Sequence, residues 1–190
     1  MAVCTTNEQP AFVSVGTHYI NGSEDGEQIK VVSSQSHSSY NATSGSYDFA
    51  LLDLEKASKF QPVNLPAAND SDIVPGMWSK VMGWGETSWP NGTDSFELRG
   101  VSLVIWSNGD CAQSFGVNDL MVCAGGVAGK DSCSNDTGSP LIKEKAKGDV
   151  DDILIGLASW GKGCGQDGYP AIYSRVSAAV EWVKSVTNKK

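Results

Sequence analysis

The stretch CAGGVAGKDSCSNDTGSPL, residues 123–141, is the most informative part of this chain. It opens at the end of one apolar run, Leu120–Ala124, and closes at the start of another, Leu141–Lys143. Between them lie Gly, Ser, Asn and Asp, residues that favour turns over strands and helices. The stretch therefore predicts two short strands joined by a long loop that holds Cys133.

Short strand-like runs recur on both sides of this stretch, separated by turn-rich segments such as 21–26, 38–46 and 89–95. Many short strands without alternating helices predict an antiparallel sandwich or barrel. The further predicted strands are Phe12–Tyr19, Gln28–Ser34, Phe49–Leu54, Ser79–Gly85, Val101–Trp106, Ile153–Trp160 and Ala171–Val176.

One helix is predicted, at the end of the chain. Ser177 is its expected N-cap, and an apolar side follows, made by Ala178, Val180, Trp182, Val183 and Val186. The segment Asn64–Ile73 has the composition of a connection between two halves. We therefore expect residues 1–65 and 66–190 to form two packed units of one domain.

Composition excludes several classes of partner. The chain has 190 residues, of which 40% are hydrophobic, with a net charge of −8 and a pI near 4.6. This acidity argues against binding to nucleic acid or to an anionic membrane. The apolar run Ile153–Trp160 is far shorter than the roughly 20 residues that span a bilayer. We therefore predict no nucleic-acid partner and no membrane partner.

Two features favour an extracellular protein. Asn-x-Ser/Thr triplets begin at Asn21, Asn41, Asn69, Asn91 and Asn135, and the first four lie among turn residues where a glycan is accommodated. The cysteines lie at positions 4, 111, 123, 133 and 164, without the Cys-x-x-Cys pair or His cluster of a zinc site. Disulfides are the favoured interpretation, buried thiols of a cytosolic protein are the alternative, and no metal or cofactor is predicted.

The beginning of the sequence departs from this interpretation. Residues 1–10 are largely polar and contain no apolar core of a signal peptide, and five cysteines leave one unpaired. Both features are explained if the chain is the C-terminal part of a longer secreted protein. Truncation is therefore our working hypothesis, with Cys4 unpaired and the signal peptide absent from this chain.

The order of the segments resembles the trypsin/chymotrypsin family of serine proteases over nearly the whole chain. YDFALLDLE is similar to the segment with the catalytic aspartate, VMGWGET to the entrance of the second barrel, and residues 123–141 to the nucleophile loop. LASWGKGC is similar to the substrate-binding strand, and YPAIYSRVSAAVEWV to the last strand and helix. The resemblance implies an all-β fold of two antiparallel barrels with a C-terminal helix, the first barrel truncated at its N terminus. It also implies the disulfides Cys111–Cys123 and Cys133–Cys164.

By this resemblance the catalytic machinery is degenerate. A serine protease needs a nucleophile, an imidazole base and a carboxylate that orients the imidazole. Asp48 matches the carboxylate, although an ordinary turn residue is the alternative. Val3 stands where the family has histidine, and Thr137 stands where it has serine. Loss of the base alone cost about 10⁶-fold in kcat in a measured Ser-His-Asp enzyme, so we predict that the chain is not an enzyme.

The residues around the nucleophile position differ too. Asn135 replaces the glycine whose N–H helps to form the oxyanion hole, and Ser139 replaces a second glycine. Asp136 resembles the buried acid that pairs with the new N terminus of an activated protease. Neither histidine is expected to act as the base, because His18 lies in a predicted strand of the first barrel and His37 at a surface position.

The substrate pocket is better preserved than the chemistry. Asp131 resembles the acid at the pocket base of trypsin-like enzymes, and Ser159, Trp160 and Gly161 resemble the pocket wall. Ala171 stands where glycine usually keeps the pocket open. These positions either form a former specificity pocket or are fold residues that have not changed, and the second interpretation is favoured.

A closer resemblance exists within the family. VSVGTHYINGSEDGEQIKVVS, PGMWSKVMGWG and CAGGVAGKDSC are similar to the glucanase inhibitor proteins that oomycete plant pathogens secrete. This implies a secreted effector of the host apoplast that binds a plant endo-β-1,3-glucanase and suppresses glucan-elicited defence. Loops 21–26, 38–46 and 87–95 are candidate binding loops, with Trp89 as anchor or as a half-buried strand-end residue. The alternatives are a weak trypsin-like protease using Thr137 and a degenerate fragment without independent function.

Overall fold

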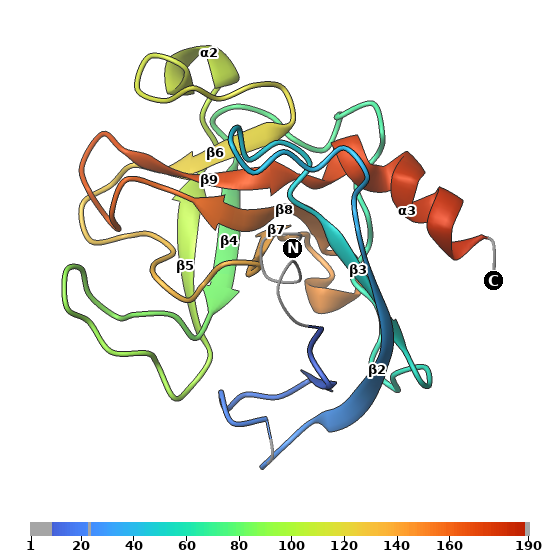
Figure 1. The fold of residues 1–190 in the computed structure, drawn as a ribbon. Coiled ribbons are helices and arrows are strands. Elements are labelled where there is room, and N and C mark those ends of the chain that lie inside the picture. The colour runs from blue at the N-terminus through green and yellow to red at the C-terminus, as the bar shows by residue number, and fades with distance from the viewer. Residues whose placement is uncertain (1–8, 23, 189–190) are drawn as a thin grey trace.

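Two antiparallel sheets build the molecule, as the computed structural model shows for residues 9–22 and 24–188 (Figure 1). The first sheet has the order β1-β2-β3, made by Phe12–Val15, Glu27–Ser36 and Ala50–Leu54. The second has the order β5-β4-β7-β8-β9-β6. Its strands in chain order are β4 (Trp78–Gly83), β5 (Arg99–Val104), β6 (Met121–Gly125), β7 (Pro140–Lys143), β8 (Ile153–Trp160) and β9 (Pro170–Arg175).

The second sheet closes on itself. Immediately after β5, Ile105 forms a bridge with Ala124 of β6, and the Trp106 N–H donates to the Cys123 carbonyl at 2.9 Å. Inward-facing apolar side chains of all six strands fill the interior, among them Val81, Leu103, Val122, Leu141, Ile155 and Tyr173. The all-β architecture and the antiparallel barrel that the sequence predicts are thus confirmed. The first sheet, with three described strands, is half of such a barrel.

The predicted strands all have counterparts, and one differs clearly in length. The run predicted as Phe12–Tyr19 leaves the sheet after Val15, because Gly16 has φ of 72° and turns the chain. His18 therefore lies outside a strand, in a turn. The boundary between residues 65 and 66 stays a prediction. The connection at this point is hydrogen-bonded to the second barrel. The Asn64 N–H donates to the Asp152 carbonyl at 3.2 Å, and the Asn64 carbonyl accepts from Leu154 at 2.9 Å.

The C-terminal helix begins later than predicted. A 3₁₀ turn, η2 (Val176–Ala179), precedes α3 (Val180–Thr187), and Ala179 occupies the N-cap without a side-chain hydrogen bond. Ser177 as the cap is therefore wrong. Its hydroxyl donates instead to the Asp70 carboxylate, a partner 107 residues away in sequence. Two further short helices, α2 (Asn108–Cys111) and η1 (Gly148–Val150), were not predicted.

Both disulfides that the resemblance implies are present. Cys111–Cys123 fastens α2 to β6, and Cys133–Cys164 ties the loop before β7 to the loop after β8. Val3 and Cys4 lie outside the described residues. No helix in residues 9–22 and 24–188 is long and apolar enough to cross a membrane.

Candidate functional site

The loop 131–139 forms the centre of the candidate site, and Asp136 holds its shape. One Asp136 carboxylate oxygen accepts from the Gly85 N–H at 2.8 Å, and the other accepts from the Cys133 N–H at 2.9 Å. A Cβ on Gly83 or Gly85 would lie within 2.6 Å of this carboxylate group, so both glycines make room for it. Asp136 therefore anchors the loop through backbone groups of this chain.

Two further backbone bonds attach the loop to β8. The Gly138 N–H donates to the Ala158 carbonyl at 2.8 Å, and the Ala158 N–H donates to the Ser139 carbonyl at 2.9 Å. With Asp136 turned inward, Asn135 and Thr137 are both exposed. Asn135 has φ of 69°, a left-handed conformation that Asn tolerates better than most side chains.

Asp48, the residue matched to the catalytic aspartate, lies just before β3 and is only 3% exposed. The Ser159 hydroxyl, from β8, donates to its Oδ2 at 2.9 Å. The loop before β3 of the first sheet and the end of β8 in the second barrel therefore meet at the buried Asp48 carboxylate. A carboxylate so placed is suited to orienting an imidazole, which is the role of the aspartate in a catalytic triad.

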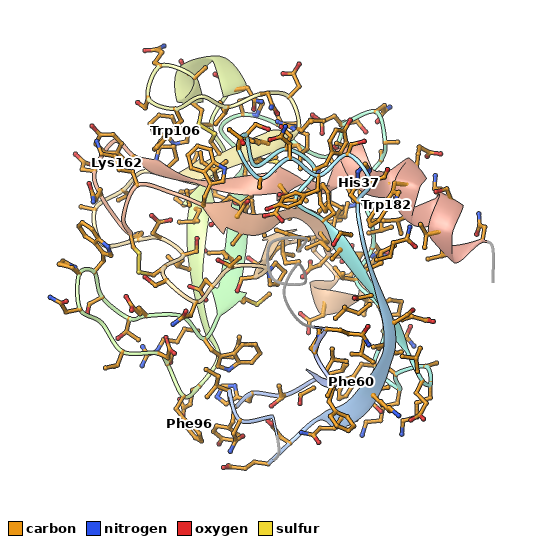
Figure 2. All side chains as sticks on the ribbon, in the orientation of Figure 1. His37, Phe60, Phe96, Trp106, Lys162 and Trp182 are labelled. Carbon is orange, nitrogen blue, oxygen red and sulfur yellow. A yellow bond between two sulfur atoms is a disulfide. The ribbon has the colours of Figure 1, made fainter. Side chains whose placement is uncertain are left out.

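The two histidines lie elsewhere, and neither lines the cavity beside Thr137. His37 follows β2 and stacks on Tyr47 with ring centroids 4.4 Å apart. Its ring also contacts Trp182 of α3 at a tilt of 55°, with centroids 4.7 Å apart (Figure 2). Loss of hydration there lowers the pKa of His37. His18 lies against Tyr19 and, at 4.0 Å, the exposed Glu97. Among the described residues, no imidazole is therefore placed to accept a proton from Thr137.

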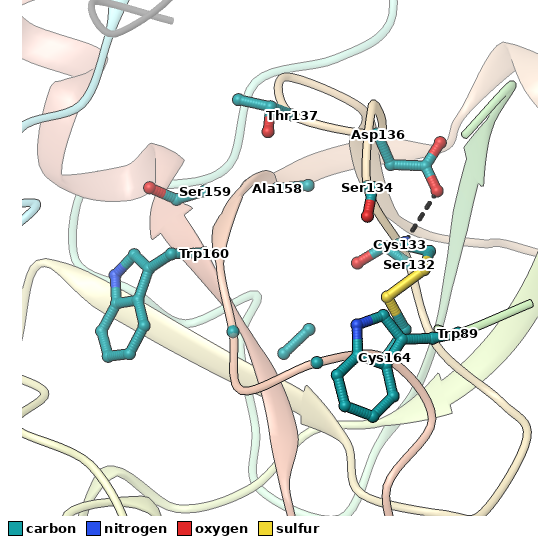
Figure 3. Close-up of a pocket in the computed structure, with 13 residues that line it drawn as sticks. Trp89, Ser132, Cys133, Ser134, Asp136, Thr137, Ala158, Ser159, Trp160 and Cys164 are labelled. Carbon is teal, nitrogen blue, oxygen red and sulfur yellow. Dashed lines mark hydrogen bonds between the residues drawn. A yellow bond between two sulfur atoms is a disulfide. The ribbon is translucent and has the colours of Figure 1, made fainter. Parts of the chain in front are cut away.

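A cavity of about 260 Å³ opens next to the loop (Figure 3). Thr137 and Ser134 border it from the loop, Trp160 flanks it from the end of β8, and Trp89 flanks it from the opposite side beside Cys164. Four of the five predicted pocket residues line this cavity: Ser159, Trp160, Gly161 and Ala171. The structure thus brings the matched nucleophile position and most of the matched pocket wall together.

Asp131, the fifth predicted pocket residue, does not line this cavity. Its two oxygens accept from the Gly165 N–H at 2.8 Å and the Ser132 N–H at 2.9 Å. Burial raises the pKa of Asp131 to about 6, against the effect of these two bonds. A lysine or arginine side chain in the cavity would therefore not meet a lining Asp131 carboxylate, as it would in a trypsin-like pocket.

Two parts of the site were not predicted from the sequence. Ser132 lines the cavity in place of Asp131, and its hydroxyl lies 3.0 Å from the Tyr173 hydroxyl, whose pKa burial raises far above its usual value. A second hollow of about 360 Å³ continues past Trp160 to Tyr40 and Gly45 of the loop 38–46. The adjacency of Ser132 to Asp131 could have indicated the first part. The second was indicated only in so far as the turn-rich loop 38–46 was a candidate binding loop, without a predicted hollow beside it.

Comparisons with known proteins agree with this geometry. The trypsin family matches residues 2–183. The chain is 65% identical over 186 residues to glucanase inhibitor protein 2 of Phytophthora infestans, covering 98% of this chain and 73% of the relative. Glucanase inhibitor protein 1 of the same organism is 64% identical, at 98% and 72% coverage. Glucanase inhibitor protein 2 of Phytophthora sojae is 60% identical, at 99% and 65% coverage. The chain therefore belongs to the trypsin family, together with these glucanase inhibitor proteins.

Proposed function

We propose that this chain is a secreted, non-catalytic member of the trypsin family that binds a plant endo-β-1,3-glucanase and inhibits it. The observation that carries the proposal is the similarity to proteins named glucanase inhibitors, at 60–65% identity over 98–99% of the chain. Such an inhibitor would limit the release of glucan fragments that elicit host defence.

The candidate site supports the non-catalytic part of the proposal. Thr137 is exposed, and no described imidazole lies beside it, so its hydroxyl lacks the base that a nucleophile of this kind needs. Asn135 adds a side chain at the position matched to the oxyanion glycine. Val3, the position matched to the catalytic histidine, has no group that accepts a proton.

Two of the proposed binding loops border the site. Tyr40, Thr43 and Ser44 of the loop 38–46 line the second hollow, and Trp89 of the loop 87–95 lines the first cavity with 49% of its surface exposed. Aromatic residues are enriched at interface hot spots, so we propose Trp89 as the anchor residue of the interface with the glucanase. Covering a glucanase cleft requires a surface of about 1,200–2,000 Å², which several loops on one face can provide.

Secretion is supported by the disulfides and by the surface position of the Asn-x-Ser/Thr triplets. Asn21, Asn41, Asn69 and Asn91 are all exposed, as glycan acceptors must be. Cys111–Cys123 and Cys133–Cys164 belong to an oxidising compartment. That Cys4 is unpaired stays a prediction, because it lies outside the described residues.

The test is to mix the purified chain with a plant endo-β-1,3-glucanase and measure release of reducing sugar from a β-1,3-glucan. We expect a dose-dependent loss of hydrolysis, with the glucanase intact on a denaturing gel and active again after separation. Trp89→Ala should weaken inhibition about tenfold or more, whereas Trp78→Ala, which alters an even more exposed tryptophan on β4, should not.

The opposite outcome is informative as well. Full glucanase activity at a large excess of folded chain would refute the inhibitor proposal. Cleavage of a lysine or arginine ester that disappears in Thr137→Ala would instead support the alternative of a weak protease. Fragmentation of the glucanase during the assay would point the same way.

A further inference from the structure

The two replacements at the nucleophile loop create a single new feature. Asn135 at the matched glycine and Thr137 at the matched serine together form the triplet Asn135-Asp136-Thr137, an acceptor sequence for an N-linked glycan. We propose that Asn135 carries an N-linked glycan that stands over the mouth of the cavity between Trp89 and Trp160. This inference does not depend on glucanase binding.

The loop presents the acceptor on the outside of the folded chain. Asn135 and Thr137 are exposed, while the intervening Asp136 side chain points inward to the Gly85 and Cys133 N–H groups. Among the described residues, no group hydrogen-bonds the Thr137 hydroxyl. The left-handed backbone at Asn135 belongs to a tight turn over residues 133–136, in which the Asp136 N–H donates to the Cys133 carbonyl at 3.0 Å. The exposed Asn135 side chain therefore accepts a substituent without repacking.

The amide of Asn135 keeps its present contact after modification. Its Nδ2 donates to Asp94 Oδ1 at 2.9 Å, on the exposed loop that carries Trp89. A primary amide has two N–H bonds, so replacing one by a bond to sugar leaves the other for Asp94. In the transfer, Nδ2 forms a bond to C1 of a lipid pyrophosphate-linked oligosaccharide. The C1–oxygen bond to the pyrophosphate breaks, and the amide loses one proton.

The position of the glycan decides its effect. Ser134 and Asp136, the residues directly before and after Asn135, line the cavity together with Thr137, so the first sugars are attached at its rim. A core glycan is larger than the cavity of about 260 Å³ and cannot enter it. The glycan therefore shields the cavity from an extended peptide, and partner contacts must come from the surrounding loops.

Peptide mapping of the chain secreted from a eukaryotic host tests the modification. Trypsin cleaves after Lys130 and Lys143, which isolates Asn135 in a peptide without another acceptor triplet. Enzymatic deglycosylation in heavy-oxygen water converts each glycosylated Asn to labelled Asp, and a digest without the deglycosylating amidase corrects for spontaneous deamidation. We expect the label at Asn135 in most molecules. An unlabelled peptide would overturn the proposal.

Three variants separate the glycan from effects on folding. Asn135→Gly suits the left-handed backbone and should remove the mass of one glycan. Thr137→Ala should remove the same mass, whereas Thr137→Ser should keep it, because serine preserves the acceptor triplet. Loss of the glycan mass in all three variants, or in none, would contradict the assignment to Asn135.

Quenching of tryptophan fluorescence by acrylamide tests the shielding. Asn135→Gly should be quenched more strongly than the glycosylated parent, because Trp160 at the cavity becomes accessible, whereas Trp89 on the surrounding loop is exposed in both. Asn69→Gln, which removes a triplet on the connection between the sheets, should leave quenching unchanged. Equal quenching of Asn135→Gly and the parent would show that the cavity is not covered.

Discussion

Asp131, which resembles the acid of a trypsin-like pocket in sequence, joins two loops in the structure and does not line the cavity beside Thr137. Its oxygens accept from the N–H groups of Gly165 and Ser132, beside the disulfide Cys133–Cys164. The side chain thus fastens the loop after β8 to the nucleophile loop. Burial makes its charged form costly, which is why the pKa of Asp131 rises from 3.8 to about 6. Its contribution to stability therefore depends on pH.

We predict that the Asp131 contribution to the free energy of unfolding falls as pH rises from about 4 to about 6. The folded chain holds a proton on Asp131 in this range and the unfolded chain does not, so stability must decrease as pH increases. Above about pH 6 the contribution is constant. Thermal unfolding of Asp131→Asn and the parent at each pH checks this, since the variant should lack this part of the slope. Parallel pH profiles would contradict it.

For individual residues, the sequence predicted the place of the residue in the fold better than the direction of its side chain. Asp48, Thr137, Ser159, Trp160 and Ala171 lie close together in the fold, because the order of the matched segments fixes where each backbone passes. The direction of the Asp131 side chain could not be predicted. It depends on the N–H of Gly165, a residue 34 positions away whose approach is set by a disulfide and a tight loop.

At the scale of elements, patterns of apolar residues located the strands, and turn chemistry set their ends. β8 has the predicted bounds, Ile153–Trp160, because it is a continuous apolar run between polar loops. α2 escaped prediction because it has four residues, too few for a helical period, although Ser107 caps it by accepting from the Asp110 N–H. The start of α3 was misplaced because Ser177 bonds to distant Asp70 instead of to its own helix.

Trp182 couples α3 to the first sheet, and this coupling is testable. Its indole packs on His37, which stacks on Tyr47, beside the buried Phe49, Val176 and Ala179. Trp182→Ala should raise the pKa of His37 toward its ordinary value, because the imidazole regains hydration. It should also lower the free energy of unfolding by about 2 kcal/mol, less than for a fully buried tryptophan.

Titration of the His37 ring protons by NMR and unfolding in urea are the two measurements for this prediction. Val183→Ala, on the same helix, is the matched control and should leave the His37 titration unchanged. An unaltered pKa of His37 in Trp182→Ala would mean that the indole does not desolvate the imidazole.

At the scale of the whole molecule, the connection between the sheets is fixed to the second barrel by a buried cation. Arg175, at the end of β9, has only 11% of its side chain exposed and pairs with Asp70 of the connection. It also donates to Asn108 Oδ1 at 2.8 Å and to the Met121 carbonyl at 2.7 Å. One side chain thus joins the connection, α2, β6 and β9.

Asp70→Ala should therefore lower the free energy of unfolding by about 2 kcal/mol, because Arg175 loses its carboxylate, though not its bonds to Asn108 and Met121, and because alanine is strained at the φ of 66°. Asp70→Asn should cost less, since Asn tolerates the φ of 66° at this position and still accepts a hydrogen bond. Urea unfolding of both variants, with the exposed Asp149→Ala as control, gives the comparison. A loss in Asp70→Ala no larger than in the control would show that the pair contributes nothing.

The hydrogen bonds from the Gly85 and Cys133 N–H groups to Asp136 determine when the nucleophile loop becomes ordered during folding. The partners of this carboxylate are backbone groups of the same folded chain, so these contacts form as the barrel forms. No cleavage is needed to supply them. The nucleophile loop therefore reaches this geometry as the barrel folds.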